Sequence, residues 1–140
     1  ADPAHSKNFG EYRVYRHSGP LEINPLSTWS VSGETVIVFN EGSTVIADGA
    51  NSGKIIDVSD NAFFGLFSTG NIVFDSSVGF NTPRSGSSLS PAVSGLFFTN
   101  DPSGSGGRII IQSTGDDTTE KQFVGSGNFN GCAQVKLERD

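Results

Sequence analysis

The chain has 140 residues, with nine Lys and Arg against 15 Asp and Glu, and a formal net charge of −6. This acidity argues against nucleic-acid binding and against an anionic membrane as partners, because both would repel it. No apolar run approaches the roughly 18–20 residues of a membrane span, and the single cysteine, Cys132, excludes an intrachain disulfide and a Cys-x-x-Cys metal site.

The composition describes one turn-rich β domain. The chain has 18 Gly, 11 Phe and no Met, and only 17 % of its residues are charged. No segment carries apolar residues at helical spacing over three turns. Low charge, abundant Ser, Thr, Asn and Gly, and almost no Cys are typical of an extracellular bacterial protein, and unlike a small disulfide-stapled domain.

Residues 1–29 are expected to form an N-terminal cap and connection. The first ten residues are polar, and Tyr12–Arg16 alternates weakly as a first strand or part of the cap. Two prolines, Pro20 and Pro25, bracket a short connection. Terminal repeats need atypical sequences to cover an open end of a core. The apolar residues available for that task are Leu21, Ile23, Leu26 and Trp29.

Residues 30–140 are expected to form β-solenoid repeats. Short β-branched or aromatic runs alternate with turns of Gly, Asn, Asp and Ser, as strand–turn–strand patterns do. The predicted strands are Thr35–Phe39, Thr44–Ala47, Lys54–Val58, Ala62–Phe67, Ile72–Phe74, Gly95–Thr99, Arg108–Gln112, Lys121–Val124 and Gln134–Leu137. Two loops, Pro83–Pro91 and Asp101–Gly107, interrupt the rhythm, and such insertions often lie on the binding face of a solenoid.

The spacing of glycines sets the predicted fold class. Gly65, Gly95 and Gly125 follow one another at intervals of thirty residues, and Gly33 precedes Gly65 by thirty-two. A fixed period in this range indicates stacked repeats. We therefore predict an all-β, right-handed parallel β-helix in which the last three glycines occupy equivalent corners of successive coils, where φ > 0 is needed.

An antiparallel β-sandwich is the alternative fold. Short, evenly spaced strands fit it too, and Asn130-Gly131 is a type I′ hairpin signal. Continuous apolar runs such as Val36–Phe39 and Ile109–Ile111 are typical of strands covered on both faces. Together with the glycine spacing, they favour the parallel arrangement.

Several phrases resemble segments of large bacterial cell-surface proteins. They are Gly65–Asp75, Gly95–Asn100, Phe123–Phe129 and Val135–Asp140. The resemblance covers roughly residues 30–140 and implies parallel β-helix coils, with no fixed activity. A fainter resemblance, to the β-rich part of pilin-like proteins, lacks the helical stem. Because Leu137–Asp140 ends the chain inside a strand-like pattern, we expect a fragment of a longer protein.

Acidic residues are the first candidates for chemistry. Polysaccharide-active β-helix enzymes need carboxylates that converge on a groove, as acid and base or as Ca²⁺ ligands. Asp57, Asp60 and Asp75 follow or end apolar strands, where Asp usually caps turns. The stretch Asp116–Glu120 is the densest acidic segment and the candidate Ca²⁺ site, although it has no EF-hand pattern. We assign no metal ligand and no cofactor.

Nucleophilic chemistry has little support. His5 and His17 have no acidic partner in sequence, and Ser94 and Ser126 lie at predicted corners rather than in a Gly-x-Ser-x-Gly elbow. Cys132 is expected to be a small buried residue. The glycine-rich run Gly104–Gly107 lacks the Gly-Lys-Ser/Thr ending of a phosphate loop. No catalytic residue is therefore assigned.

Aromatic residues are expected mainly in the core, with Phe74 and Phe97 buried. The pairs Phe63-Phe64 and Phe97-Phe98 cannot both point inward, because neighbouring side chains of a strand face opposite sides. Exposed rings would suit a glycan or a protein partner. Tyr12, Tyr15 and Trp29 are further candidates for stacking on sugars.

The sequence thus favours a non-enzymatic structural or adhesive segment of a secreted or surface-anchored bacterial protein. Its expected partner is a glycan or another surface protein. A carbohydrate-binding module or polysaccharide-active β-helix enzyme is the alternative, and a pilin-like fibre subunit is the third. Converging carboxylates would indicate the enzyme, and an exposed aromatic platform would indicate the module.

Overall fold

The computed structural model describes residues 11–80, 91–101, 107–116 and 119–139. The described residues contain no helix; they form strands joined by turns. The strands are β1 Glu11–Ser18, β2 Leu21–Ile23, β3 Trp29–Val31, β4 Glu34–Glu41, β5 Thr44–Ile46, β6 Ile56–Val58, β7 Phe63–Ser68, β8 Ile72–Phe74, β9 Val93–Thr99, β10 Arg108–Ile111, β11 Gly125–Gly131 and β12 Gln134–Leu137.

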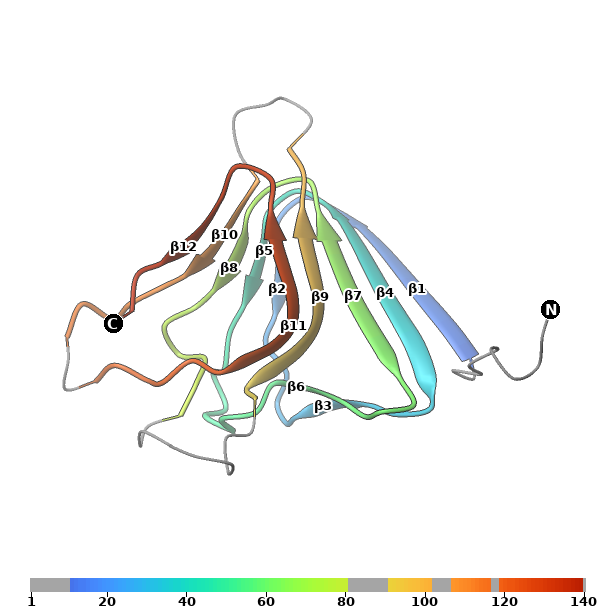
Figure 1. Cartoon of the computed structure of the whole chain (residues 1–140), viewed down its shortest axis with the longest axis horizontal. Coiled ribbons are helices and arrows are strands. Elements are labelled where there is room, and N and C mark those ends of the chain that lie inside the picture. Colours follow the sequence, from blue (N-terminus) through green and yellow to red (C-terminus); the bar gives the residue numbers. More distant parts are fainter. Residues whose placement is uncertain (1–10, 81–90, 102–106, 117–118, 140) are drawn as a thin grey trace.

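Two parallel sheets organise these strands into a curled half-barrel (Figure 1). The seven-stranded sheet has the order β1-β4-β7-β9-β6-β3, with β11 paired to β9, and the five-stranded sheet has the order β12-β10-β8-β5-β2. The chain passes from a long strand of the first sheet to a short strand of the second, then returns. We call one such passage a coil; the five coils begin at β1, β4, β7, β9 and β11.

Every ladder between named strands is parallel, so the antiparallel sandwich is wrong. The antiparallel contact found among the described residues is one isolated bridge, between Phe80 and Gln122. The hairpin expected at Asn130-Gly131 is also wrong. Strand β11 pairs with β9 and strand β12 with β10, so the residues between them turn from one sheet to the other.

The predicted strands are largely confirmed, including Ile72–Phe74 and Gln134–Leu137 as predicted. Lys121–Val124 is wrong as a strand: it holds only the bridge at Gln122, and β11 starts at Gly125. Residues 11–29, expected in the cap and connection, hold β1, β2 and the first residue of β3, which belong to the same two sheets. The expected loop residues 83–90 and 102–106 lie outside the described part of the chain.

The equivalence of the three glycines is wrong, although each lies in a long parallel strand. Gly65 is opposite Leu96, Gly95 is opposite Gly127, and Gly125 is opposite Val93. Gly95 has a positive φ of 140°, whereas Gly65 and Gly125 do not have a positive φ. Paired residues are in fact separated by 23, 28, 31 and 32 residues along the series β1-β4-β7-β9-β11. The constant thirty-residue spacing is therefore not the structural repeat.

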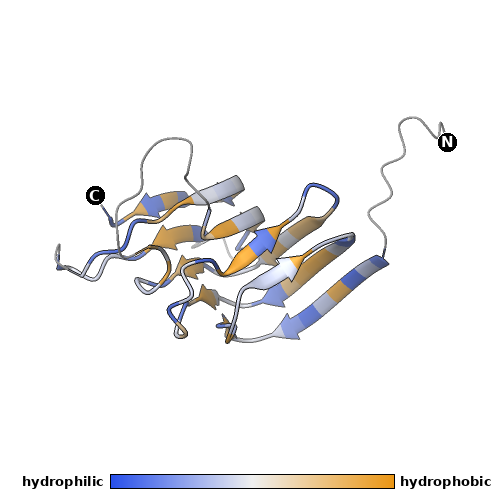
Figure 2. Ribbon diagram, turned by 90° about the horizontal axis from the view of Figure 1, so that it is seen from below, coloured by the Kyte–Doolittle hydropathy of each residue, from blue (hydrophilic) through white to orange (hydrophobic). Residues whose placement is uncertain are grey.

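The core lies inside the curl, between the two sheets. Phe64, Phe74 and Phe97 are fully buried, which confirms the prediction for Phe74 and Phe97. Ring centroids are 5.2 Å apart between Phe74 and Phe97, and 5.0 Å apart between Phe97 and Phe129 of the next coil. Such contacts between aromatic rings stabilise the fold by more than the burial of their apolar area alone. Colouring by hydropathy shows apolar strands along the stack (Figure 2).

Candidate functional site

An aligned row of phenylalanines covers part of the outer face of the seven-stranded sheet. Phe39 is opposite Phe67, and Phe67 is opposite Phe98, on β4, β7 and β9. Their chain neighbours Val38, Leu66 and Phe97 are buried in the core, so alternation along the strand turns these three rings outward. We call Phe39, Phe67 and Phe98 the phenylalanine row.

Neighbouring rings of the row contact one another: Phe39 and Phe67 stack, and Phe98 is tilted against Phe67. Centroids are 5.3 Å apart between Phe39 and Phe67, at an interplanar angle of 23°, and 6.0 Å apart between Phe67 and Phe98, at 46°. Phe39 and Phe67 therefore cover one face of each other, whereas Phe98 meets Phe67 at an angle. Phe39 and Phe98 remain 41 % and 39 % exposed.

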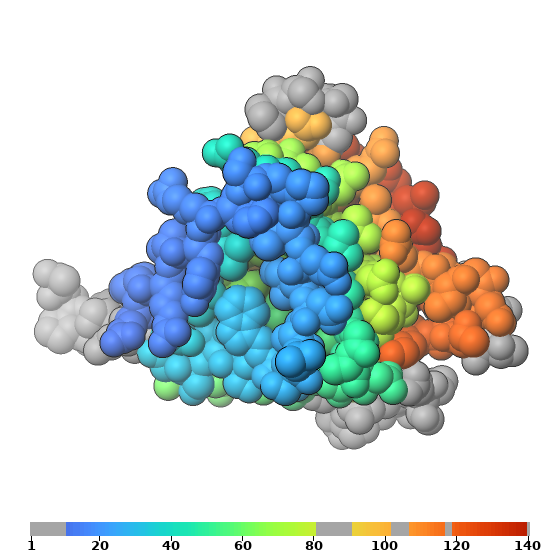
Figure 3. Space-filling view, turned by 180° about the vertical axis from the view of Figure 1, so that it is seen from behind, coloured from blue at the N-terminus to red at the C-terminus, as the bar shows by residue number. Residues whose placement is uncertain are grey.

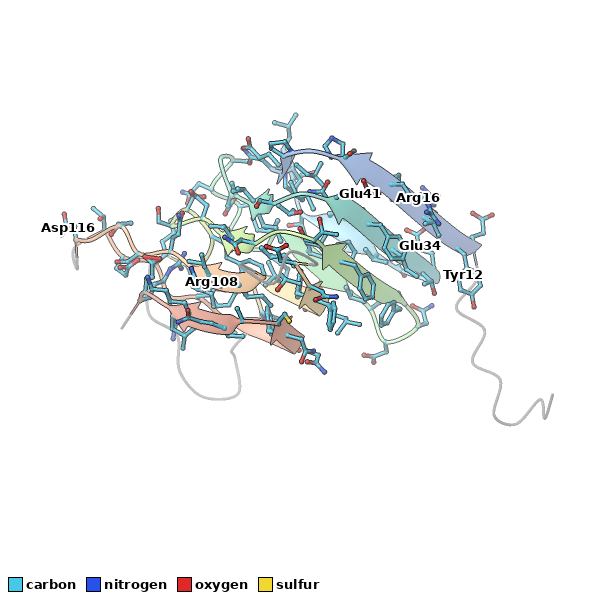
Figure 4. The ribbon with its side chains drawn as sticks, turned by 90° about the horizontal axis from the view of Figure 1, so that it is seen from above. Tyr12, Arg16, Glu34, Glu41, Arg108 and Asp116 are labelled. Atoms are coloured by element: carbon cyan, nitrogen blue, oxygen red, sulfur yellow. The ribbon has the colours of Figure 1, made fainter. Side chains whose placement is uncertain are left out.

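Polar groups close both ends of the row. The guanidinium of Arg16 lies 5.6 Å from the Phe39 centroid, a cation–π contact made from the neighbouring strand β1. Asn130 of β11 is opposite Phe98 at the other end. Figure 4 labels Arg16 on β1 beside Glu41 at the end of β4. The apolar row is thus bounded by one cation and one amide.

A second outward row runs beside the first. Its register positions are Val14, Ile37, Gly65, Leu96 and Asn128. At Gly65, an added Cβ would come within 3.1 Å of the rings of Phe63 and Phe67. Glycine at this position therefore leaves room for large rings on both sides. The small size of Gly65 therefore accounts for a glycine inside strand β7, between two phenylalanines on the same face.

Shallow grooves follow these rows. One, of about 310 Å³, is lined by the phenylalanine row with Arg16, Glu41 and Thr69. The other, of about 430 Å³, is lined by residues that include Phe63, Leu96 and Asn128. Phe63 is 37 % exposed while Phe64 is buried, and Phe98 is exposed while Phe97 is buried. The prediction that each Phe pair turns one ring outward is confirmed.

Buried polar side chains support the row from inside. Asn40, Ser68 and Thr99 each follow a member of the row and occupy one register line in the corner between the sheets. The Asn40 amide nitrogen donates to Thr44 Oγ1 at 3.0 Å, and Thr44 Oγ1 donates to Ser68 Oγ at 3.3 Å. Satisfied buried hydrogen bonds of this kind fix a corner. Because each of these polar residues directly follows a phenylalanine of the row, the fixed corner also fixes the outward direction of the three rings.

The strand pairing does not bring the predicted carboxylates Asp57 and Asp75 together. Asp57 lies in β6, opposite Ser30, and its Oδ1 is 3.5 Å from Lys54 Nζ. Asp75 follows β8 in the other sheet, and its Oδ2 accepts the Ser77 N–H at 3.0 Å. Asp60 is in the exposed turn after β6. Asp75 therefore acts as the turn cap that its position suggested.

Glu120, from the candidate Ca²⁺ stretch, binds groups of the protein instead. Its Oε2 accepts from Ser113 Oγ, and its Oε1 accepts from the Thr114 N–H at 3.3 Å and lies 3.7 Å from Arg139 Nε. Asp117 lies outside the described residues. In the described part of the chain, no three His, Cys, Asp or Glu side chains gather to hold a metal ion.

Arg139 is the buried cation that sequence reasoning missed. Its guanidinium donates to four backbone carbonyl oxygens, those of Asp75, Val78, Gln112 and Lys121. Burial lowers the pKa of Arg139 from its ordinary value, and the carboxylates of Glu120 and Asp75 act in the opposite direction. Nothing in the local sequence marks this role, because each partner is distant along the chain.

The remaining candidates are spread over the fold. His17 Nδ1 is 2.9 Å from Asn40 Oδ1, and Ser94 is opposite Ser126 on adjacent strands. Cys132 is exposed, so its predicted burial is wrong; it lies at the turn of the last coil, which no further described coil covers. His5 and the run from Gly104 to Gly106 lie outside the described residues.

The aromatic candidates near the N-terminus separate into two kinds. Tyr12 and Tyr15 are 73 % and 47 % exposed on the edge strand β1. Trp29 is half-buried, with its ring 5.2 Å from Phe64 and nearly perpendicular to it. Trp29 therefore packs against the core, which leaves less of its ring for stacking on a ligand.

Comparisons with family models, with curated proteins and with solved structures find no match to this chain. No helix in the described residues is long and apolar enough to cross a membrane.

Proposed function

We propose that the chain is a right-handed parallel β-helix. Its support is the repeated order of strands, from the seven-stranded sheet to the five-stranded sheet and back, with parallel pairing between successive coils. Strand β3 pairs with β6, and β6 with the start of β9, which gives the coils a third side. The handedness follows from the strong preference for right-handed connections between parallel strands.

We further propose that this β-helix is a non-enzymatic structural or adhesive segment of a secreted or surface-anchored bacterial protein. The observation that carries the adhesive part is the phenylalanine row. Three aligned, partly exposed rings, with the apolar side chains of the second row beside them, form a contiguous patch on the outer face of the seven-stranded sheet. Contiguous exposed apolar patches on soluble domains mark interaction sites.

The partner that this patch fits best is a protein surface. A sugar stacks on the face of an aromatic ring, but the faces of Phe39 are occupied by Phe67 and Arg16, and Phe98 is tilted against Phe67. The partly exposed rings, bordered by Arg16 and Asn130, offer apolar contact with a polar rim. That combination is typical of protein interfaces. The carbohydrate-binding alternative is less well supported by the same geometry.

A bead-retention assay tests this function. Beads coated with the protein are passed over bacterial and mammalian cells, with and without protease treatment of the cells. The variant Phe39→Ser/Phe98→Ser removes the two exposed rings of the row, and we expect it to lower retention about tenfold or more. Leu26→Ser is the matched control, because Leu26 is 94 % exposed but lies outside the row.

Three results would contradict the proposal. Retention that survives protease treatment, together with a hit on a glycan array, would favour the carbohydrate-binding module. Release of reducing ends from acidic polysaccharides would favour the enzyme. Equal retention of the row variant and the Leu26→Ser control would show that the row is not the adhesive surface.

A further inference from the structure

The C-terminal end of the curl presents an uncovered apolar inner face. Phe129, Val135 and Leu137 are opposite the buried residues Phe97, Ile109 and Ile111, so all three belong to the inward side of the last coil. Val135 is nevertheless 44 % exposed and Leu137 is 68 % exposed. Among the described strands, β11 and β12 each pair on one edge only.

The N-terminal end presents a hollow with a similar inner row. Tyr15, Leu21 and Ile23 are opposite Val38, Thr44 and Ile46, which are buried. They line a hollow of about 280 Å³ with His17 and Trp29. Figure 3 looks onto this end, with β1 and β2 in blue. Strands β1 and β2 also pair on one edge only within the described residues.

The two ends match in register. A single offset of 114 residues places the three inward residues of one end opposite those of the other: Phe129 opposite Tyr15, Val135 opposite Leu21, and Leu137 opposite Ile23. The same offset fits both sheets because the connections from one sheet to the other have equal length. Two residues, Gly19–Pro20, join β1 to β2, and two residues, Cys132–Ala133, join β11 to β12.

The side chains at the two ends are also complementary in size. At the same offset, the inward polar residues Arg13 and His17 of β1 lie opposite Gly127 and Gly131 of β11, which carry no side chain. Large residues on one end thus meet glycine on the other. The direction of the strands also fits, since every ladder between named strands is parallel and an added copy in the same orientation continues them.

We propose that the C-terminal end of one copy of this chain stacks on the N-terminal end of the next. Strands β1 and β2 of the second copy extend the two sheets as strands parallel to β11 and β12 of the first. The contact is head-to-tail and continues both parallel sheets along the direction of the stack, so it builds an open filament. This inference goes beyond the proposed adhesive function and does not depend on it.

The exposed thiol of Cys132 provides a direct test. The offset places Cys132 opposite Ser18, and neighbouring strands lie about 4.8 Å apart, within the Cα separation that a disulfide spans. Within one copy the two positions are four strand steps apart, roughly 19 Å, which prevents an internal bridge. Mild oxidation of the Ser18→Cys variant should therefore give a ladder of covalent oligomers on a non-reducing gel.

Three matched proteins control this test. The unsubstituted chain forms at most a disulfide dimer, because it has one cysteine. Thr69→Cys places a second thiol on an exposed turn in the middle of the stack, and we expect no ladder from it. Adding Leu137→Lys to the Ser18→Cys variant should reduce the ladder about tenfold or more, since a charge would then enter the apolar contact. Adding Asp60→Lys, which introduces a lysine in the exposed turn after β6 and away from both ends, should leave the ladder unchanged.

Sedimentation velocity on the unsubstituted chain completes the test. We expect the average mass of the particles to rise with protein concentration. For Leu137→Lys, the same rise should need about tenfold more protein. The proposal would be overturned if the Ser18→Cys variant gave no ladder, or if the unsubstituted chain stayed a monomer at every concentration. Either result would indicate that something else covers the C-terminal end, such as a following segment of a longer chain. Dimers linked only through two Cys132 residues would indicate tail-to-tail contact and also overturn it.

Discussion

The Arg139 Nη2 donates to the carbonyl oxygen of Asp75 at 2.8 Å, across 64 residues of sequence. The same guanidinium reaches carbonyls of Val78, Gln112 and Lys121, and its side chain is only 5 % exposed. Arg139 therefore ties the last coil to the turn after β8 and to the segment that follows β10.

Replacing Arg139 by Leu should destabilise the protein by about 3 kcal/mol, because four backbone acceptors lose their partner in a buried site. Urea unfolding measures the change. Lys136→Leu is the control, since Lys136 is on the exposed face of the same segment and, within the described residues, its ion pair is a long one of 4.0 Å to Glu138. Similar unfolding midpoints for the two variants would contradict the structural role of Arg139.

Two adjacent phenylalanines of β9 should respond differently to truncation. Phe97 is fully buried among Phe64, Phe74 and Phe129, so Phe97→Ala should cost about 3–5 kcal/mol. Phe98→Ala should cost about 1 kcal/mol or less, because its ring is partly exposed on the outer face. Thermal melting of the two variants checks the inward and outward assignment, and a reversed order would contradict it.

Gly95 should resist substitution by alanine. Its φ is 140°, and an added Cβ would lie 2.8 Å from the Phe64 carbonyl oxygen of the neighbouring strand. Strain and clash together should cost at least about 2 kcal/mol. Gly19→Ala is the control: Gly19 also has a positive φ, of 95°, but nothing lies within 4 Å of the added Cβ. Equal losses in denaturant melts would show that Gly95 is not closely packed against β7.

Much of the fold could be predicted from local sequence, because β-branched and aromatic runs between Gly, Asn and Asp turns mark most strands. The register could not. The turns between strands differ in length, so paired residues are separated by 23 to 32 residues, and the equal spacing of Gly65, Gly95 and Gly125 suggested a false alignment. Register is set by which side chains face the core, and spacing alone does not reveal that.

The phenylalanine row did leave a signal that the glycine spacing obscured. Each of its members directly precedes a small polar residue, in Phe39-Asn40, Phe67-Ser68 and Phe98-Thr99. Those polar residues are the buried ones of the corner. The burial of Arg139 and the exposure of Cys132 had no such signal, because both depend on which coils lie next to them.

The central claim is that successive coils stack in parallel and in register, which aligns the phenylalanine row. An engineered disulfide between β9 and β11 tests it most directly. Ser94 and Ser126 are opposite each other on these strands. In a Cys132→Ser background, Ser94→Cys/Ser126→Cys should oxidise rapidly to an intramolecular disulfide, seen as loss of both free thiols in a monomer. Ser94→Cys/Asn130→Cys, displaced by four residues or roughly 13 Å, should not. Efficient bridging of the displaced pair, with none in the aligned pair, would contradict the account.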